Sequence, residues 1–221
     1  MPFTRIIIAS ILSIFLLIGC ATVDKKTEKP AKDLAKEGME QFNKEKYKAA
    51  NETFQKIKDW YPFSKYSILA ELKLADSHYH LHNYDEAIMA YEEFEDLHPL
   101  NEAIPYVIYQ KGLCYFDQID TIDRDQKTTR KALSIFKRLE SQHGGSSYTE
   151  KAASHIKKCM EKLANNEFYV ALFYFKSKNY KAALNRFQKI SVNYPDSGLN
   201  SRSLKYIGLC EKQLEKEKKE E

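Results

Sequence analysis

The stretch GMEQFNKEKYKAANETFQKIKDWYPFS, Gly38 to Ser64, predicts two short helices separated by a turn, because its apolar residues recur at helical spacing. A small residue, Gly38 or Ala50, stands where the two helices have to approach closely. Pro62 ends the second helix, since proline lacks a backbone donor and disfavours helix at the residue before it. One such pair cannot bury its apolar face alone, so we expect further copies.

Two further segments repeat the pattern at the same offsets. A fourth segment, from Gly112, carries an insertion, and a fifth, around Gly208, is truncated. This is the tetratricopeptide pattern. We therefore predict an all-α tetratricopeptide-repeat solenoid of about five helix-turn-helix repeats. The three aligned series are Gly38, Phe42, Tyr47, Ala50, Phe54, Ile57 and Pro62; Ala75, Tyr79, Tyr84, Ala87, Tyr91, Phe94 and Pro99; and Ala171, Phe175, Tyr180, Ala183, Phe187, Ile190 and Pro195.

Residues 1–19 have the pattern of a secretory leader, with Arg5 followed by about thirteen mostly apolar residues. The leader ends in Leu-Ile-Gly before Cys20, which matches a bacterial lipoprotein signal. We expect the Cys20 thiol to carry a diacylglycerol and the freed amine a further acyl chain, an anchor of two or more chains. Ala21 is not the Asp that retains lipoproteins in the inner membrane. The expected location is therefore the periplasmic face of the outer membrane.

The rest of the chain is predicted to fall into four parts. Residues 20–33 form the lipidated N-terminus and a polar, flexible tether, with Asp33 as the cap of the first helix. Residues 34–105 hold repeats one and two, residues 106–215 hold repeats three to five, and residues 216–221 form a charged tail. We expect one long helix, or two nearly continuous ones, from 148 to 175, because that stretch contains no helix breaker.

Composition and motifs argue against several classes of function. The formal net charge of +4 comes without a basic block interleaved with aromatics, so we expect no nucleic-acid partner. We find no catalytic motif and predict that the protein is not an enzyme. The aspartates of the insertion lack the calcium-loop pattern, and His78 and His82 lack the H-E-x-x-H pattern. We therefore expect no metal or other cofactor.

The three cysteines beyond the leader are predicted to be core residues. Cys114 and Cys210 each lie two residues past the repeat's glycine, at equivalent positions. Equivalence at a repeat position favours packing over reactivity. A disulfide between two of Cys114, Cys159 and Cys210 stays an open, less favoured alternative in an oxidising compartment.

Several segments outside the generic repeat resemble one family. They are WYPFSKYS after the first repeat, HPLNEAIPYVIYQKGLCYF across the third, the DRDQ segment at Asp123–Gln126, and LANNEFYVALFYFKSKNYKAALNRFQKISVNYPDS. Together they resemble the BamD family, also called ComL or YfiO, whose members are tetratricopeptide lipoproteins of the outer-membrane β-barrel assembly machinery. The resemblance covers roughly residues 17–212.

The resemblance implies a non-enzymatic scaffold of the β-barrel assembly (BAM) complex, which inserts β-barrel proteins into the outer membrane. Its C-terminal half would bind a POTRA domain of BamA, alongside other BAM lipoproteins. The arginine that faces BamA in the family corresponds to Arg186. The N-terminal half would offer a groove for the targeting strand of unfolded outer-membrane proteins, with Phe63, Tyr66 and Tyr79 as candidate contacts.

A second hypothesis stays open. A periplasmic tetratricopeptide lipoprotein that coordinates other cell-envelope or peptidoglycan enzymes would explain the leader and the repeats. It would not explain the segments that resemble the BamD family.

Overall fold

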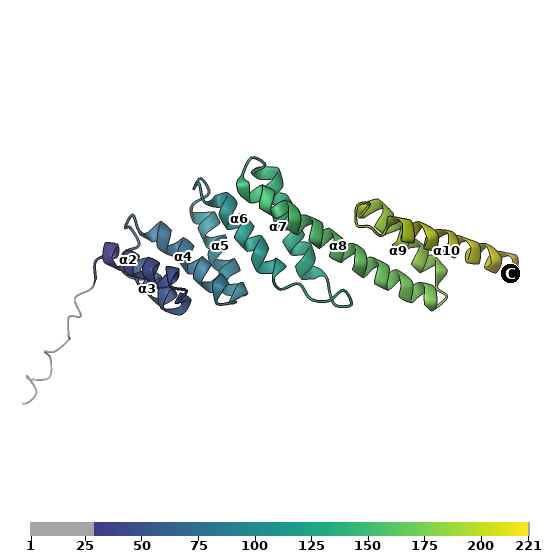
Figure 1. The fold of residues 1–221 in the computed structure, drawn as a ribbon, viewed down its shortest axis with the longest axis horizontal. Helices are drawn as coiled ribbons and strands as arrows, with labels where there is room; N and C mark the ends of the chain where they lie inside the picture. Colours follow the sequence, from purple (N-terminus) through teal and green to yellow (C-terminus); the bar gives the residue numbers. More distant parts are fainter. Residues whose placement is uncertain (1–28, 221) are drawn as a thin grey trace, which may run out of the picture.

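The computed structural model describes residues 29–220, which form nine α-helices and no strand (Figure 1). Successive helices run antiparallel and stack side by side into an elongated array. This confirms the predicted all-α repeat solenoid. The helices are α2 (Ala31–Asn43), α3 (Tyr47–Trp60), α4 (Ser67–His80), α5 (Tyr84–Leu97), α6 (Ile104–Phe116), α7 (Lys127–Gln142), α8 (Ser147–Lys176), α9 (Tyr180–Asn193) and α10 (Asn200–Glu220).

Two of the helix pairs are held by an aromatic ring against a glycine. A Cβ added to Gly38 would lie 2.8 Å from Cε1 of Phe54, and one added to Gly112 would lie 2.5 Å from Cε1 of Phe136. Both rings are fully buried. The close approach predicted from the sequence is therefore confirmed, and glycine is favoured at both positions because any Cβ would press on the ring.

Three of the turns between paired helices share one backbone conformation. Glu45, His82 and Lys178 occupy equivalent positions and have φ of 58°, 60° and 62°. The left-handed region is uncommon for residues with a Cβ, so its occurrence at three equivalent positions is a feature of the repeat. In the last of these turns the Asn179 side chain accepts a hydrogen bond from the backbone N–H of Ala182 at 3.2 Å. The common turn keeps the helix pairs in register.

Helix α8 departs from the regular repeat. It spans 30 residues, and Ser146 caps its start by accepting a hydrogen bond from the backbone N–H of Tyr148. This confirms the expectation of an unbroken helix. Its first half, up to Cys159, belongs to the core of α4–α7, whereas its second half, from Ala164, belongs to a separate core with α9 and α10. One division between cores therefore falls inside α8.

The element boundaries correct several predicted ones. Helix α2 begins at Ala31, so Asp33 lies in the first turn, where a carboxylate interacts favourably with the helix dipole, and does not cap the helix. Helix α6 begins at Ile104, and α10 continues to Glu220 through most of the predicted tail. The predicted leader and lipidation site, residues 1–19 and Cys20, lie outside the described residues.

The cysteines and the helix lengths bear on chemistry and membrane insertion. Cys114, Cys159 and Cys210 are buried and unpaired, as predicted, and burial raises the pKa of Cys114 and Cys159 to about 12. Because the thiolate is the reactive form, these two thiols are inert at neutral pH. Between residues 29 and 220, none of the helices combines the length and the apolar content needed to span a bilayer.

Candidate functional site

The second half of α8 exposes a face that is buried in three other first helices of the repeats. The residue two places after the repeat's small position is fully buried in α4, α6 and α10, where it is Ser77, Cys114 and Cys210. In α8 the equivalent residue is Phe173, which is 62% exposed. Tyr169, one helical turn earlier, is half exposed.

The length of α8 explains this exposure. In the repeats that begin with α4, α6 and α10, the second helix of the preceding repeat packs on the first helix. Here the preceding second helix, α7, packs on the first half of α8, where His155 stacks on Phe136 with ring centroids 5.2 Å apart. The second half of α8 extends beyond α7. In the described residues, no helix precedes α2 either, and there the equivalent residue is the exposed, charged Glu40. The exposed position therefore carries an aromatic ring in α8, whereas it carries a charge in α2.

Next to this face lies an ion-pair cluster between α8 and α9. The Arg186 guanidinium lies 2.7 Å from Oε2 of Glu167, and the Lys189 ammonium lies 2.5 Å from Oε1. The Glu167 side chain is buried, whereas those of Arg186 and Lys189 are 37% and 49% exposed. Burial alone would raise the pKa of Glu167, but hydrogen bonds from Lys189 and Arg186 outweigh it and hold that pKa below its usual value.

The ion-pair cluster and the aromatic face are continuous. The guanidinium carbon of Arg186 lies 5.9 Å from the ring centroid of Tyr174, and that centroid lies 5.7 Å from the ring centroid of Phe173. Arginine over an aromatic face is a favourable cation–π arrangement. We call the set of Tyr169, Phe173, Tyr174, Arg186 and Lys189 the α8–α9 surface. It combines exposed aromatic rings with two cations held in fixed positions.

The insertion between α6 and α7 is attached to α8 next to Glu167. Asn166 donates a hydrogen bond to the backbone carbonyl of Ile122 at 2.6 Å. The buried Gln126 donates to the carbonyls of Thr121 and Arg124, which fixes the loop from within. The DRDQ segment therefore lies at the N-terminal limit of the α8–α9 surface.

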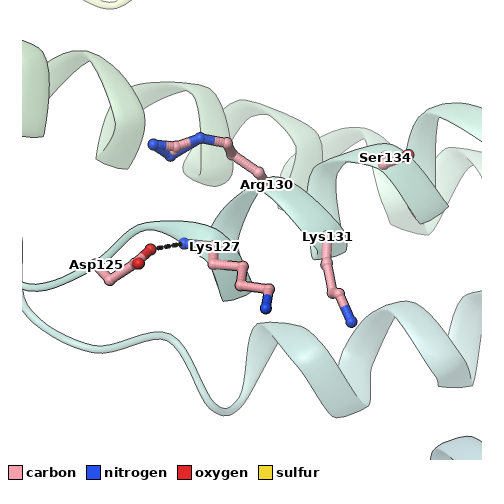
Figure 2. Close-up of a pocket in the computed structure, with 5 residues that line it drawn as sticks. All are labelled: Asp125, Lys127, Arg130, Lys131 and Ser134. Carbon is pink, nitrogen blue, oxygen red and sulfur yellow. Dashed lines mark hydrogen bonds between the residues drawn. The ribbon is translucent and has the colours of Figure 1, made fainter.

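A cavity of about 390 Å³ at the start of α7 carries three cations (Figure 2). Its lining includes Lys127, Arg130 and Lys131, and Asp125 accepts a hydrogen bond from the backbone N–H of Lys127 at 2.5 Å. Figure 2 shows that Arg130 extends to the opposite side from the two lysines. The three charges do not converge on one point, so we do not assign a small-anion site to this cavity.

The three residues predicted to line a substrate groove are not brought together. Tyr66 precedes the first residue of α4 and Tyr79 lies near its last, so about 20 Å of helix separates them. The Tyr79 hydroxyl donates a hydrogen bond to Asp117 at 2.7 Å, at the far end of α6. Phe63 lies at the tip of the α3–α4 turn and is fully exposed.

The N-terminal half does contain a groove, of about 420 Å³, between α3 and α5 with α4 as its floor. The floor is partly apolar, with Leu74, and Met89 and Ala90 line the α5 side. An ion pair of 2.7 Å between Lys58 and Glu93 joins the two walls. None of the three predicted groove residues lines it.

Of the residues of this surface, Arg186 was predicted from the sequence and its aromatic neighbours were not. The signal was present, because Phe173 aligns with Ser77, Cys114 and Cys210. A large aromatic residue at a position that is small and buried in these three helices does not fit the regular packing. The sequence does not show that Phe173 is exposed, because the exposure arises from α7 covering only the first half of α8.

Comparisons with known proteins agree on one family. The YfiO family model, described as an outer membrane lipoprotein, matches residues 27–221. The outer membrane protein assembly factor BamD of Rickettsia prowazekii is 31% identical over 194 residues, 85% of this chain and 77% of that protein. BamD of Neisseria meningitidis serogroup B is 30% identical over 217 residues, 90% of this chain and 81% of that protein. BamD of Vibrio cholerae is 27% identical over 208 residues, 89% of this chain and 86% of that protein.

Among solved structures, a thermophilic TPR protein from Thermus thermophilus matches 80% of this chain and 98% of its own, with a TM-score of 0.44 and 16% identity. The family assignment depends on the sequence matches, which extend over nearly all of the described helices. The chain belongs to the YfiO family of outer membrane lipoproteins, and its relatives there are the outer membrane protein assembly factors BamD.

Proposed function

We propose that this protein is a lipid-anchored, non-enzymatic scaffold of the BAM complex, held at the periplasmic face of the outer membrane through Cys20. In this proposal the α8–α9 surface binds a POTRA domain of BamA, and the complex includes other BAM lipoproteins. The observation that carries the proposal is the exposure of Phe173, joined to Arg186 through Tyr174, on a helix face that is buried in α4, α6 and α10.

The residues of this surface are of the kind that anchors protein interfaces. Aromatic residues and arginine dominate interface hot spots, because they bury a large area and still offer directed contacts. The Arg186 guanidinium uses one edge for Glu167 and remains partly exposed. Its other donors can pair with a carboxylate of the partner. The buried Glu167 keeps the guanidinium in place before the partner arrives, which lowers the entropy cost of binding.

The test of this interface is an affinity measurement between the mature chain and the periplasmic domains of BamA. Phe173→Glu is expected to weaken binding strongly, because it places a charge in the centre of the interface. Leu204→Glu is the matched control, since it changes a comparably exposed apolar side chain on α10. Equal affinity of both variants and wild type would remove the α8–α9 surface from the proposal. Co-purification of peptidoglycan enzymes without BamA would favour the other adaptor role.

For the N-terminal half, we propose that the groove between α3 and α5 receives the targeting strand of an unfolded outer-membrane protein. Its partly apolar floor suits side chains of an extended peptide, and Lys58 and Glu93 at its rim suit backbone polar groups. Phe63, Tyr66 and Tyr79 lie outside this groove, so a role for them in the same contact requires a longer peptide path.

The groove is tested with a fluorescent peptide that copies the C-terminal strand of a β-barrel protein. Ala90→Trp is expected to reduce binding, because the larger side chain fills the space beside Met89. Lys48→Trp on the exposed side of α3 serves as the control. Unchanged binding by Ala90→Trp would place the peptide elsewhere.

A further inference from the structure

The turns that lead from each second helix to the next repeat lie along one edge of the molecule, the upper edge in Figure 1. The first two of these turns end in apolar tips. Phe63 and Leu100 each follow the proline that ends the second helix, and their exposed fractions are 101% and 99%. No part of the described chain covers either side chain. Such full exposure of a large apolar side chain is costly in water.

Each tip is accompanied by a second exposed apolar residue, three positions earlier in the sequence. Trp60 ends α3 and Leu97 ends α5, and both are about half exposed. The two later turns along the same edge differ, since Gly145 and Asp196 occupy the positions equivalent to Phe63 and Leu100. The apolar tips are thus confined to the two N-terminal repeats.

The chain also enters the fold at this edge. Helix α2 begins at Ala31, and the Tyr61 hydroxyl, directly after α3, donates a hydrogen bond to the backbone carbonyl of Lys29 at 3.1 Å. Nine residue steps separate Cys20 from Lys29. A chain of that length reaches at most about 30 Å. A lipid on Cys20 would therefore hold this edge within about 30 Å of the membrane surface.

We propose that the edge formed by Trp60, Phe63, Leu97 and Leu100, here called the Trp60 edge, lies on the membrane and inserts its side chains between the lipid headgroups. This inference rests on the lipid anchor at Cys20 proposed above. Tryptophan and other apolar side chains settle at the membrane–water interface, where the apolar part leaves water and the polar part stays hydrated. The anchor and the tips act as several weak attachments on one chain, which strengthen one another.

A lipid surface fits these tips better than a protein groove does. Phe63 and Leu100 protrude singly from successive turns, and neither lines a cavity described above. A partner protein would need a separate hollow for each tip, whereas a fluid headgroup layer accommodates both. The flanking exposed charges are mixed in sign, with Lys65 near the first tip and Glu102 near the second. Apolar insertion, and not attraction to anionic lipid, therefore drives the contact.

Trp60 provides the test, because it is the only tryptophan in the sequence. Residues 20–221 carrying an N-terminal histidine tag are bound to nickel-chelating lipid in vesicles of phosphatidylethanolamine and phosphatidylglycerol. We expect the emission of Trp60 to shift to the blue and to be quenched when the vesicles contain brominated acyl chains. Phe63→Asp combined with Leu100→Asp is expected to abolish both changes, and Leu204→Asp on α10 is expected to leave them intact.

If the bound protein shows the same Trp60 emission on brominated and plain vesicles, the proposal that the Trp60 edge inserts into the membrane is wrong. The tag replaces the natural lipid, so this result does not depend on acylation of Cys20. Acylation itself is read by mass spectrometry of the protein purified from bacterial membranes. An unmodified Cys20 would contradict the lipid anchor of the proposed function. The quenching experiment separately tests whether the Trp60 edge contacts the membrane.

Discussion

Each half of the molecule contains a buried carboxylate, and the two are used differently. In the N-terminal half, Asp76 on α4 accepts hydrogen bonds from Tyr91 at 2.7 Å and Tyr106 at 2.8 Å and pairs with Lys73 at 2.8 Å. In the C-terminal half, Glu167 on α8 pairs with Arg186 and Lys189. The partners of Asp76 are mostly buried, whereas those of Glu167 are a third to a half exposed.

The difference separates a structural network from a candidate binding site. Asp76 joins α4, α5 and α6, so its hydrogen bonds connect the second repeat to the third. Burial raises the pKa of Tyr91 well above its usual value, and the nearby Asp76 adds to this, so the phenol stays a hydrogen-bond donor. Glu167 instead holds two cations at the surface. The same chemical group stabilises the solenoid in one half and orients exposed charges in the other.

The largest expected effect is the loss of the Asp76 network. Asp76→Ala leaves two tyrosine hydroxyls and an ammonium without their acceptor in the interior. We expect it to lower the free energy of unfolding by about 3–5 kcal/mol, as when one member of a buried pair is removed. Urea unfolding followed by circular dichroism measures the change. Asp96→Ala, on the outer side of α5, should stay within about 0.5 kcal/mol of wild type. Equal effects of both substitutions would contradict a structural role for Asp76.

Replacing two glycines at the same repeat position by alanine is expected to change the unfolding free energy in opposite directions. Gly112→Ala would place a Cβ 2.5 Å from the fully buried Phe136 ring, and we expect a loss of about 1–3 kcal/mol. Gly208→Ala meets no atom within 4 Å, because no second helix packs on that face of α10 in the described chain. It should stabilise the protein by about 0.5–1 kcal/mol through helix propensity. Thermal unfolding of both variants checks this, and stabilisation by Gly112→Ala would mean that Phe136 can move aside.

These glycines show how much of the fold the sequence predicts. The close approach at Gly38 follows from spacing alone, because it is made within one repeat, whereas the structure shows which rings, Phe54 and Phe136, pack on Gly38 and Gly112. The helix boundaries shift by a few residues, as at Ala31 and Ile104, since helix ends depend on local turns and not on the repeat. The long α8 was also predictable, from the absence of a breaker between Ser147 and Lys176.

The candidate site was only partly predictable. Arg186 came from the resemblance to a family, but its pairing with Glu167 depends on how α8 and α9 align. The exposure of Phe173 depends on where α7 stops covering α8, a contact between distant parts of the chain. The predicted groove residues failed to converge because Tyr66 and Tyr79 lie at opposite ends of one helix. Spacing along the chain identifies contacts within a repeat, whereas surfaces between repeats require the structure.

A smaller effect is expected for the contribution of Arg186 to the proposed association with BamA. Arg186→Gln is expected to weaken binding about tenfold, which corresponds to about 1.4 kcal/mol, because only arginine combines a planar fork with stacking on Tyr174. Lys189→Gln gives a comparison within the same surface, since it removes the other partner of Glu167 but not a guanidinium fork. We expect it to change the affinity by less than about threefold. Equal losses would show that the stability of the cluster, and not the Arg186 fork, determines binding.

The smallest expected effect is the pH dependence that Glu167 adds to stability. Its pKa in the folded chain lies below the usual 4.5, because the hydrogen bonds from Lys189 and Arg186 outweigh the effect of burial. A carboxylate with a lowered pKa stabilises the fold above its unfolded pKa, and this contribution is lost as the pH falls through the folded pKa. The difference in unfolding free energy between wild type and Glu167→Gln should therefore be constant from pH 7 to about 5.5 and shrink below about 4.5. Because both cations are partly exposed, we expect a difference of about 1 kcal/mol or less. A difference that grows on acidification would mean that Glu167 is protonated in the folded state, and that Arg186 is not held by a charged partner.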